Sequence, residues 1–115
     1  MDYSNQRNKT IILKEKGKLH QIAIEDIVYV ECDGYVSTIH TNNNKQPVSC
    51  SVLLKEIEEK VEGYRFYRIN RNTMVNLKYF KSYISGKKRC FETTTEVEMK
   101  VSRRKWCVFR KNLDE

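Results

Sequence analysis

Basic side chains are concentrated in one window of this 115-residue chain, residues 63–90. That window contains eight Lys and Arg residues and no Asp or Glu, whereas the whole chain has 22 basic and 15 acidic residues and a net charge of +7. It also holds six aromatic residues: Tyr64, Phe66, Tyr67, Tyr79, Phe80 and Tyr83. A localised basic block in a chain with a pI near 9.3 is typical of a nucleic-acid binder, and the alternative is a solvated basic surface.

Two side chains within the window have the chemistry of base readout. Arg71 lies in the polar turn 70–72, and its planar guanidinium matches the O6 and N7 atoms of guanine through two parallel hydrogen bonds. Asn70 offers the donor and acceptor pair that matches adenine. The alternative role for Arg71 is a contact to a phosphate.

The lysines of the same window are predicted to contact phosphates, which position a duplex without reading its sequence. They are Lys78, Lys81, Lys87 and Lys88, and Arg89 is predicted to act in the same way. Residues 87–89 lie at the tip of a predicted hairpin, where a solvated loop explains them equally well.

A second basic cluster begins the last predicted helix. Ser102 is its predicted cap, and its hydroxyl and the free N–H groups of a helix N-terminus suit a phosphate. Arg103, Arg104 and Lys105 then occupy the first turn, where positive charge opposes the helix dipole. An anionic partner would offset that cost.

Several neighbouring residues have predicted structural roles instead. Arg68 stands beside Phe66 in a strand, which favours a partly buried arginine or one that braces the turn. Asn76 is expected to bond to the backbone of a turn. Trp106 and Phe109 are spaced i, i+3 on the last helix and are expected in the core.

No catalytic or metal-binding pattern is present in the sequence. The four cysteines contain no Cys-x-x-Cys pair, both histidines stand alone, and the four glycines are scattered singly at predicted turns. The cysteines are Cys32, Cys50, Cys90 and Cys107, which we expect to be small, half-buried thiols. We predict no enzymatic activity, no metal and no cofactor.

The hydrophobic pattern predicts one mostly β domain. We expect strands over 10–16, 19–24, 27–32, 36–41, 46–50, 65–69, 79–85, 90–93 and 96–101, with a further apolar segment at 74–75. Gly17-Lys18 is the predicted first turn, and Pro47 predicts an edge strand. One helix is expected between a Ser51 cap and Gly63, with Leu53, Leu54, Ile57 and Val61 as its apolar stripe, and a second after Ser102.

The start of the sequence has no apolar stretch of the signal-peptide type. The first ten residues are polar, and no run approaches the ~18 apolar residues of a membrane span. We therefore expect a cytoplasmic protein with no membrane contact. We expect residues 1–9 to be a flexible segment and residues 10–113 to be the domain.

Four segments together resemble the LytTR DNA-binding domain, the output module of LytR/AlgR-type transcriptional regulators. They are Glu25–Glu31, Ser51–Ile57, Phe66–Leu77 and Val101–Arg104. The most specific feature is Phe-x-Arg, six residues, then Val-Asn-Leu, followed late in the chain by Val-Ser-Arg-Arg. The order and spacing hold from about residue 10 to residue 113.

The resemblance implies short strands in small antiparallel sheets, and binding of duplex DNA by loops and strand ends in successive major grooves. It implies base contacts from Ser37, Asn70, Arg71 and Arg104, with Tyr35 as a neighbouring contact. It also implies two protomers on tandem direct repeats that bend the DNA between them. The family often has His, Lys or Arg, and then Ser where this chain has 70–72, which predicts a different preferred DNA sequence.

Two other functions fit the same basic window. One is binding of RNA or single strands by stacking bases on Tyr64, Tyr67, Tyr79 and Tyr83. The other is an interaction module for an acidic protein. For the DNA-binding role we expect a monomer or weak dimer in solution, and regulation by a receiver domain or a separate signalling partner.

Overall fold

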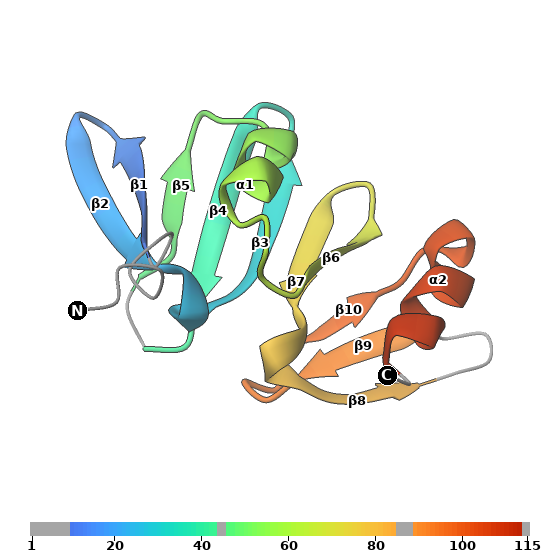
Figure 1. Ribbon diagram of the computed structural model, residues 1–115. Helices are drawn as coiled ribbons and strands as arrows, with labels where there is room; N and C mark the ends of the chain where they lie inside the picture. Colours follow the sequence, from blue (N-terminus) through green and yellow to red (C-terminus); the bar gives the residue numbers. More distant parts are fainter. Residues whose placement is uncertain (1–9, 44–45, 85–88, 114–115) are drawn as a thin grey trace.

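The computed structural model describes residues 10–43, 46–84 and 89–113 (Figure 1). The predicted flexible segment 1–9 lies outside these ranges. The strands are β1 (Thr10–Glu15), β2 (Lys18–Ala23), β3 (Ile27–Asp33), β4 (Val36–Thr41), β5 (Val48–Cys50), β6 (Phe66–Asn70), β7 (Thr73–Asn76), β8 (Phe80–Ile84), β9 (Cys90–Thr93) and β10 (Glu98–Lys100). The α-helices are α1 (Leu54–Lys60) and α2 (Arg103–Leu113), and η2 (Ile24–Asp26) and η3 (Leu77–Tyr79) are short 3-10 turns.

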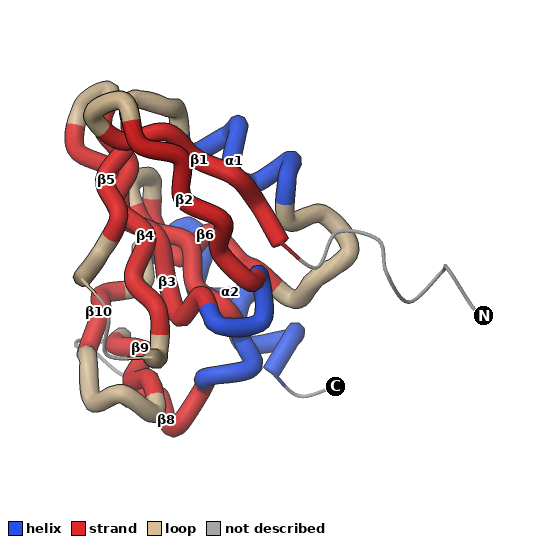
Figure 2. Tube along the Cα trace, turned by 90° about the vertical axis from the view of Figure 1, so that its left-hand side faces the viewer, coloured by secondary structure: helices blue, strands red, loops and turns tan. Residues whose placement is uncertain are grey.

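The strands form three antiparallel sheets. β1 pairs with β2, the central sheet has the order β5-β4-β3-β7-β6, and the third has the order β10-β9-β8. The third sheet lies at the bottom of both views, whereas α1 lies at the top (Figures 1 and 2). The predicted mostly β fold, with small antiparallel sheets and two short helices, is confirmed.

The central sheet separates two hydrophobic clusters because its strands alternate buried residues between two faces. On one face Val30, Ile39 and Met74 pack with Ile57 of α1 and with the β1–β2 hairpin. Covering this face removes the apolar side chains of three strands from water, at about 25 cal/mol per Å².

The other face of the central sheet packs against the third sheet and α2. Val75 and Ile69 are fully buried there with Phe91 and Val101. Trp106 of α2 packs against this cluster, as predicted for a core residue. The side chain of Phe109 is outside the described part of α2. Since α2 is anchored on this cluster, the start of α2 is fixed relative to β6.

Two predicted boundaries are wrong for identifiable reasons. The first turn is Lys16-Gly17 rather than Gly17-Lys18, because both residues have positive φ (50° and 82°), as a two-residue hairpin turn requires. The last strand begins at Glu98 rather than Glu96, because Glu96 has a φ of 68° and belongs to the preceding turn.

The start of α1 also differs from the prediction. The helix begins after Leu53, and not after a Ser51 cap. The Leu53 N–H donates to Oε1 of Glu56 at 3.3 Å, so a carboxylate within the first turn satisfies an N–H at the helix start. Gly63 has a φ of 94° just beyond the helix, consistent with its predicted role at the helix end. The strand after Pro47 is at the sheet edge, as predicted.

The four cysteines are free thiols, and Cys50 is the most buried of them. Burial, followed by the charges of Glu15 and Glu56, raises the pKa of its thiol. In the described ranges no group of three or more His, Cys, Asp or Glu side chains is arranged to hold a metal. In the same ranges no helix is long and apolar enough to cross a membrane.

Asn76 is the last residue of β7, and its side chain joins β7 to β3 and η3, as predicted for a backbone-bonding asparagine. Its Nδ2 donates to the Ile27 carbonyl at 2.9 Å, and its Oδ1 accepts the Lys78 N–H at 3.0 Å. The side chain is 4% exposed, so water cannot readily replace it.

We expect Asn76→Ala to lower the free energy of unfolding by about 2–3 kcal/mol, because it removes a buried donor to the Ile27 carbonyl and the acceptor of the Lys78 N–H. Urea unfolding followed by circular dichroism measures this change. Asn42→Ala is the matched control, since Asn42 is exposed, and should change stability by less than about 0.5 kcal/mol. Equal effects of the two substitutions would contradict the assigned role.

Candidate nucleic-acid interface

Three connections lie together at one edge of the molecule, and we call them the turn edge. They are the β3–β4 turn (33–36), the β6–β7 turn (70–73) and the junction of β10 with α2 (100–105). Figure 1 shows them at the upper ends of their strands, from the centre of the view to the right.

Hydrogen bonds tie the three connections to each other. The Cys32 N–H donates to the Asn72 carbonyl at 2.8 Å, which joins the first connection to the second. The Ser102 N–H donates to the Ile69 carbonyl at 2.7 Å, which joins the third connection to β6. The edge is therefore built from backbone groups of two sheets and a helix start.

Asn70 adds a side-chain tie at the same place. Its Nδ2 donates to the Lys100 carbonyl at 2.8 Å, and its Oδ1 accepts the Asn72 N–H at 2.9 Å. Both ends of the carboxamide are thus engaged within the protein. The predicted pairing with adenine would require the release of both hydrogen bonds.

The turn edge is basic and exposed. It carries one acidic residue, Asp33, and five basic residues, which are Arg71, Lys100, Arg103, Arg104 and Lys105. All five are exposed, and none forms an ion pair with another residue in the part of the chain that the structure describes. Unpaired, exposed guanidinium and ammonium groups remain available to an anionic ligand.

Arg68 braces the β6–β7 turn, as the sequence predicted. Its Nη1 donates to the Arg71 carbonyl at 3.4 Å, and its Nε lies 3.5 Å from Oε1 of Glu58 in α1. Arg71 itself directs no side-chain hydrogen bond to any described residue. The backbone of the turn is held while the Arg71 guanidinium is free.

Ser37, for which a base contact is predicted, lies inside the protein. Ser37 is 0% exposed, and its hydroxyl donates to the Val52 carbonyl at 2.7 Å. The residue is a structural link between β4 and the segment before α1. Its neighbour Tyr35 is 80% exposed at the tip of the β3–β4 turn, so Tyr35 is the side chain that this turn presents.

The start of α2 matches the prediction. Oγ of Ser102 accepts the Lys105 N–H at 3.2 Å, which is an N-cap hydrogen bond. The Ser102 N–H is used by Ile69, so only its hydroxyl and the first N–H groups of α2 remain for a phosphate. Arg103 and Arg104 extend from the first turn with no carboxylate in that turn.

Two of the predicted phosphate ligands lie away from the turn edge. Lys78 and Lys81 follow β7, at the end of that strand opposite to Arg71. Lys81 lies 3.2 Å from Glu96 and 3.9 Å from Glu92, and its hydrogen bond to Glu96 raises its pKa. Lys78 lies 4.0 Å from Glu25. Lys87 and Lys88 fall outside the described residues.

Sequence reasoning missed Lys100 at this edge. Its strand lies outside the basic window, and the neighbouring Glu98 made the segment look electrically neutral. The polar, apolar, polar order of Glu98, Met99 and Lys100 was the available signal, and the structure shows it as exposed, half-buried and exposed.

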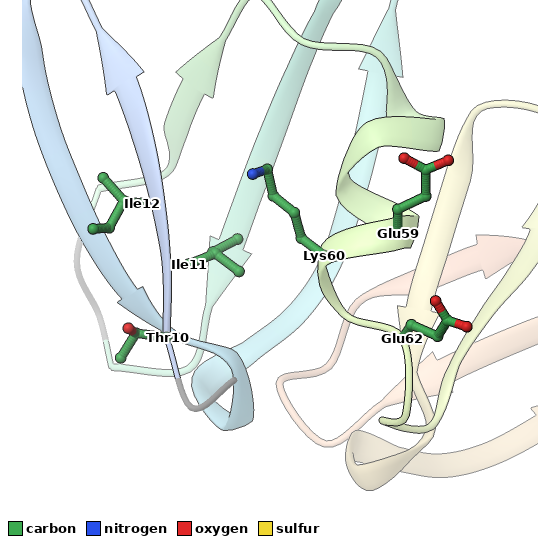
Figure 3. A pocket seen from close by; sticks show the side chains of 6 residues that line it. All are labelled: Thr10, Ile11, Ile12, Glu59, Lys60 and Glu62. Atoms are coloured by element: carbon green, nitrogen blue, oxygen red, sulfur yellow. The ribbon is translucent and has the colours of Figure 1, made fainter. Parts of the chain in front are cut away.

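A shallow cavity of about 520 Å³ lies elsewhere, between β1 and the end of α1 (Figure 3). Lys60 extends from α1 toward β1, and Glu59 and Glu62 line the same cavity. No turn-edge residue lines it, and its two carboxylates against one ammonium do not favour an anion. The turn edge is therefore the candidate site.

Comparison with known proteins agrees with this fold and identifies the family of the chain. The model of the family described as the LytTr DNA-binding domain matches residues 17–114. The chain therefore belongs to the LytTr DNA-binding domain family.

Two curated bacterial relatives are transcription or signalling proteins. The chain is 27% identical over 89 residues to the transcriptional regulatory protein NatR of Bacillus subtilis, and the matched region covers 77% of the chain. It is 28% identical over 99 residues to the sensory transduction protein LytR of Staphylococcus saprophyticus, which covers 84% of the chain. It spans 37% of the length of each relative.

A solved structure shares the architecture. The LytTr DNA-binding domain of a Bacillus cereus protein superimposes with a TM-score of 0.77 at 19% identity. The match covers 91% of this chain and 96% of the other. At that identity the likeness concerns the fold alone.

We expect Asn70→Ala to lower the free energy of unfolding by about 1–2 kcal/mol, because two backbone groups lose their partner. Arg71→Ala should change it by less than about 0.5 kcal/mol, because the Arg71 side chain is exposed and unpartnered among the described residues. Urea unfolding of both variants makes the comparison. A larger loss for Arg71→Ala would contradict the division between positioning and contact residues.

Proposed function

We propose that this chain is the DNA-binding domain of a transcriptional regulator and that it binds duplex DNA sequence-specifically through the turn edge. The supporting observation is that five exposed basic side chains without an acidic partner, among the described residues, stand on an edge whose backbone is tied together. Such an edge suits a rigid polyanion, because little conformational freedom is lost on binding.

The roles of the side chains follow from their placement. Arg71 and Arg104 read base edges in the major groove, which is about 12 Å wide and accepts a projecting turn. Tyr35, Arg103 and the Ser102 hydroxyl contact phosphates and set the register, together with Lys100 and Lys105.

Family membership supports a proposal for the arrangement on DNA. We propose that two protomers occupy tandem direct repeats, with one turn edge in each of two successive major grooves. Because the curated relatives are longer than this chain, we also propose that a further domain or a separate partner supplies the regulatory signal.

The single-strand alternative finds less support. It requires four stacking tyrosines, yet Tyr79 is 8% exposed and its hydroxyl donates to the Glu25 carbonyl. Burial, with the charges of Asp26 and Glu25, raises the pKa of Tyr79. Tyr83 is exposed but contacts the Trp106 ring edge-on at 5.5 Å. These four tyrosines therefore do not form an exposed row of rings on which bases could stack.

Selection of bound sites from random duplexes tests the proposal. We expect one enriched motif, and affinity for it should fall with salt at a log–log slope of about −4 to −5, as for four to six neutralised phosphates. Single strands of the same sequence should compete poorly at equal salt. No enriched motif, or preference for single strands, would contradict the proposal, and no retardation of any nucleic acid at physiological salt would favour an acidic protein partner.

Arg71→Ala and Arg104→Ala should each cost about 1–3 kcal/mol of binding free energy on the selected site and blur the preference at one base pair. Lys81→Ala is the matched control, because its ammonium is already paired with Glu92 and Glu96. Lys81→Ala should change the affinity for the selected duplex by less than about twofold. Fluorescence anisotropy with the selected duplex and with single-base variants measures these effects, and an equal loss in all three variants would contradict the placement of the interface.

A further inference from the structure

The Arg68 guanidinium occupies an unusual position between α1 and the tip of the β6–β7 turn. The Arg68 side chain is 28% exposed, and its Nε is shielded from solvent and lacks a hydrogen-bond acceptor. Its nearest carboxylate oxygen, Oε1 of Glu58, is 3.5 Å away. Since Glu58 supplies charge neutralisation but not an ideal hydrogen bond, the guanidinium depends on Glu58 for its placement.

The other end of the same guanidinium holds the turn. Nη1 of Arg68 donates to the carbonyl of Arg71, the residue at the tip, at 3.4 Å. The neighbouring groups of the turn have shorter bonds, at 2.9 Å for the Asn72 N–H and 2.8 Å for the Asn72 carbonyl. The Arg71 carbonyl is thus the most weakly held point of the turn, and a small shift of Arg68 would release it.

The pair also lies where α2 meets the central sheet. Glu58 and Arg68 line a cavity of about 200 Å³ with Lys105 and Val108 of α2 and the rings of Phe66 and Tyr67. Glu58 and Arg68 therefore lie next to α2 as well as to the β6–β7 turn.

We infer that Glu58 and Arg68 are positioning residues for base readout: the ion pair fixes the Arg71 carbonyl, and with it the direction in which the Arg71 side chain leaves the turn. Glu58 acts from α1 without contacting DNA. The inference rests on the proposed function, and it assigns base specificity in part to a carboxylate, a residue type that opposes DNA binding by charge alone.

Because the charge of Glu58 opposes DNA binding, the electrostatic effect and the positioning effect change the affinity in opposite directions. Glu58→Gln removes a negative charge near the turn edge, so long-range electrostatics alone predicts slightly tighter binding to every duplex. A positioning role predicts weaker binding to the selected site, by about fivefold, with no loss on unrelated duplexes. Glu59→Gln is the matched control, since Glu59 is the next residue of α1, is exposed and forms no ion pair with a described residue.

Fluorescence anisotropy with the selected duplex, its single-base variants and an unrelated duplex makes the comparison. We expect Glu58→Gln, but not Glu59→Gln, to lose discrimination at the base pair that Arg71→Ala also blurs. Arg68→Lys should lose it too, because an ammonium lacks the fork that spans both contacts. The Glu58→Gln/Arg68→Lys double variant should lose no more than the worse single variant. If Glu58→Gln behaves like Glu59→Gln, the inference is overturned.

A measurement without DNA separates this inference from the proposed function. Amide hydrogen exchange at Asn72 should be about fivefold faster in Glu58→Gln than in the wild type and unchanged in Glu59→Gln. Unchanged exchange in both variants would overturn the coupling of Glu58 to the turn, whatever the DNA result. Failure of the wild type to select any duplex, with faster exchange in Glu58→Gln, would instead contradict the proposed function and leave the coupling supported.

Discussion

The hydrogen bonds at the end of β6 determine how the candidate site is built. The Asn70 carboxamide reaches the Lys100 carbonyl, and the Ser102 N–H reaches the Ile69 carbonyl, so the central sheet, the third sheet and α2 meet at one point. Backbone groups near a sheet end must find partners, and here they find them in the neighbouring connections. The same bonds that satisfy the backbone bring the turn-edge cations together.

The fold separates basic residues that are neighbours in the sequence. The basic window is continuous in the sequence, yet β7 carries the chain from Arg71 at one end of the sheet to Lys78 at the other. Carboxylates from other elements then pair with Arg68, Lys78 and Lys81. The turn edge instead combines Arg71 with basic residues of the β10–α2 junction, which are distant from it in the sequence.

Local patterns predicted much of the fold, because strand alternation, Gly and Pro placement and the Ser102 cap depend on nearby residues. The same reasoning identified Arg68 as a brace and Asn76 as a backbone partner. Local patterns could not show two contacts between residues distant in the sequence: the Ser37 hydroxyl donates to the Val52 carbonyl, and the Asn70 carboxamide donates to the Lys100 carbonyl thirty residues away. The start of α1 was missed because a carboxylate inside the helix, Glu56, satisfies an N–H at its start.

The central claim is that DNA lies on the turn edge and not on the rest of the basic window. An NMR titration of ¹⁵N-labelled protein with the selected duplex tests it most directly, because each backbone amide reports separately. The account predicts the largest amide shifts at Tyr35, at Arg71 and Asn72, and from Lys100 to Arg104. Largest shifts along β8 near Lys81, or on the β1–β2 hairpin, would contradict it.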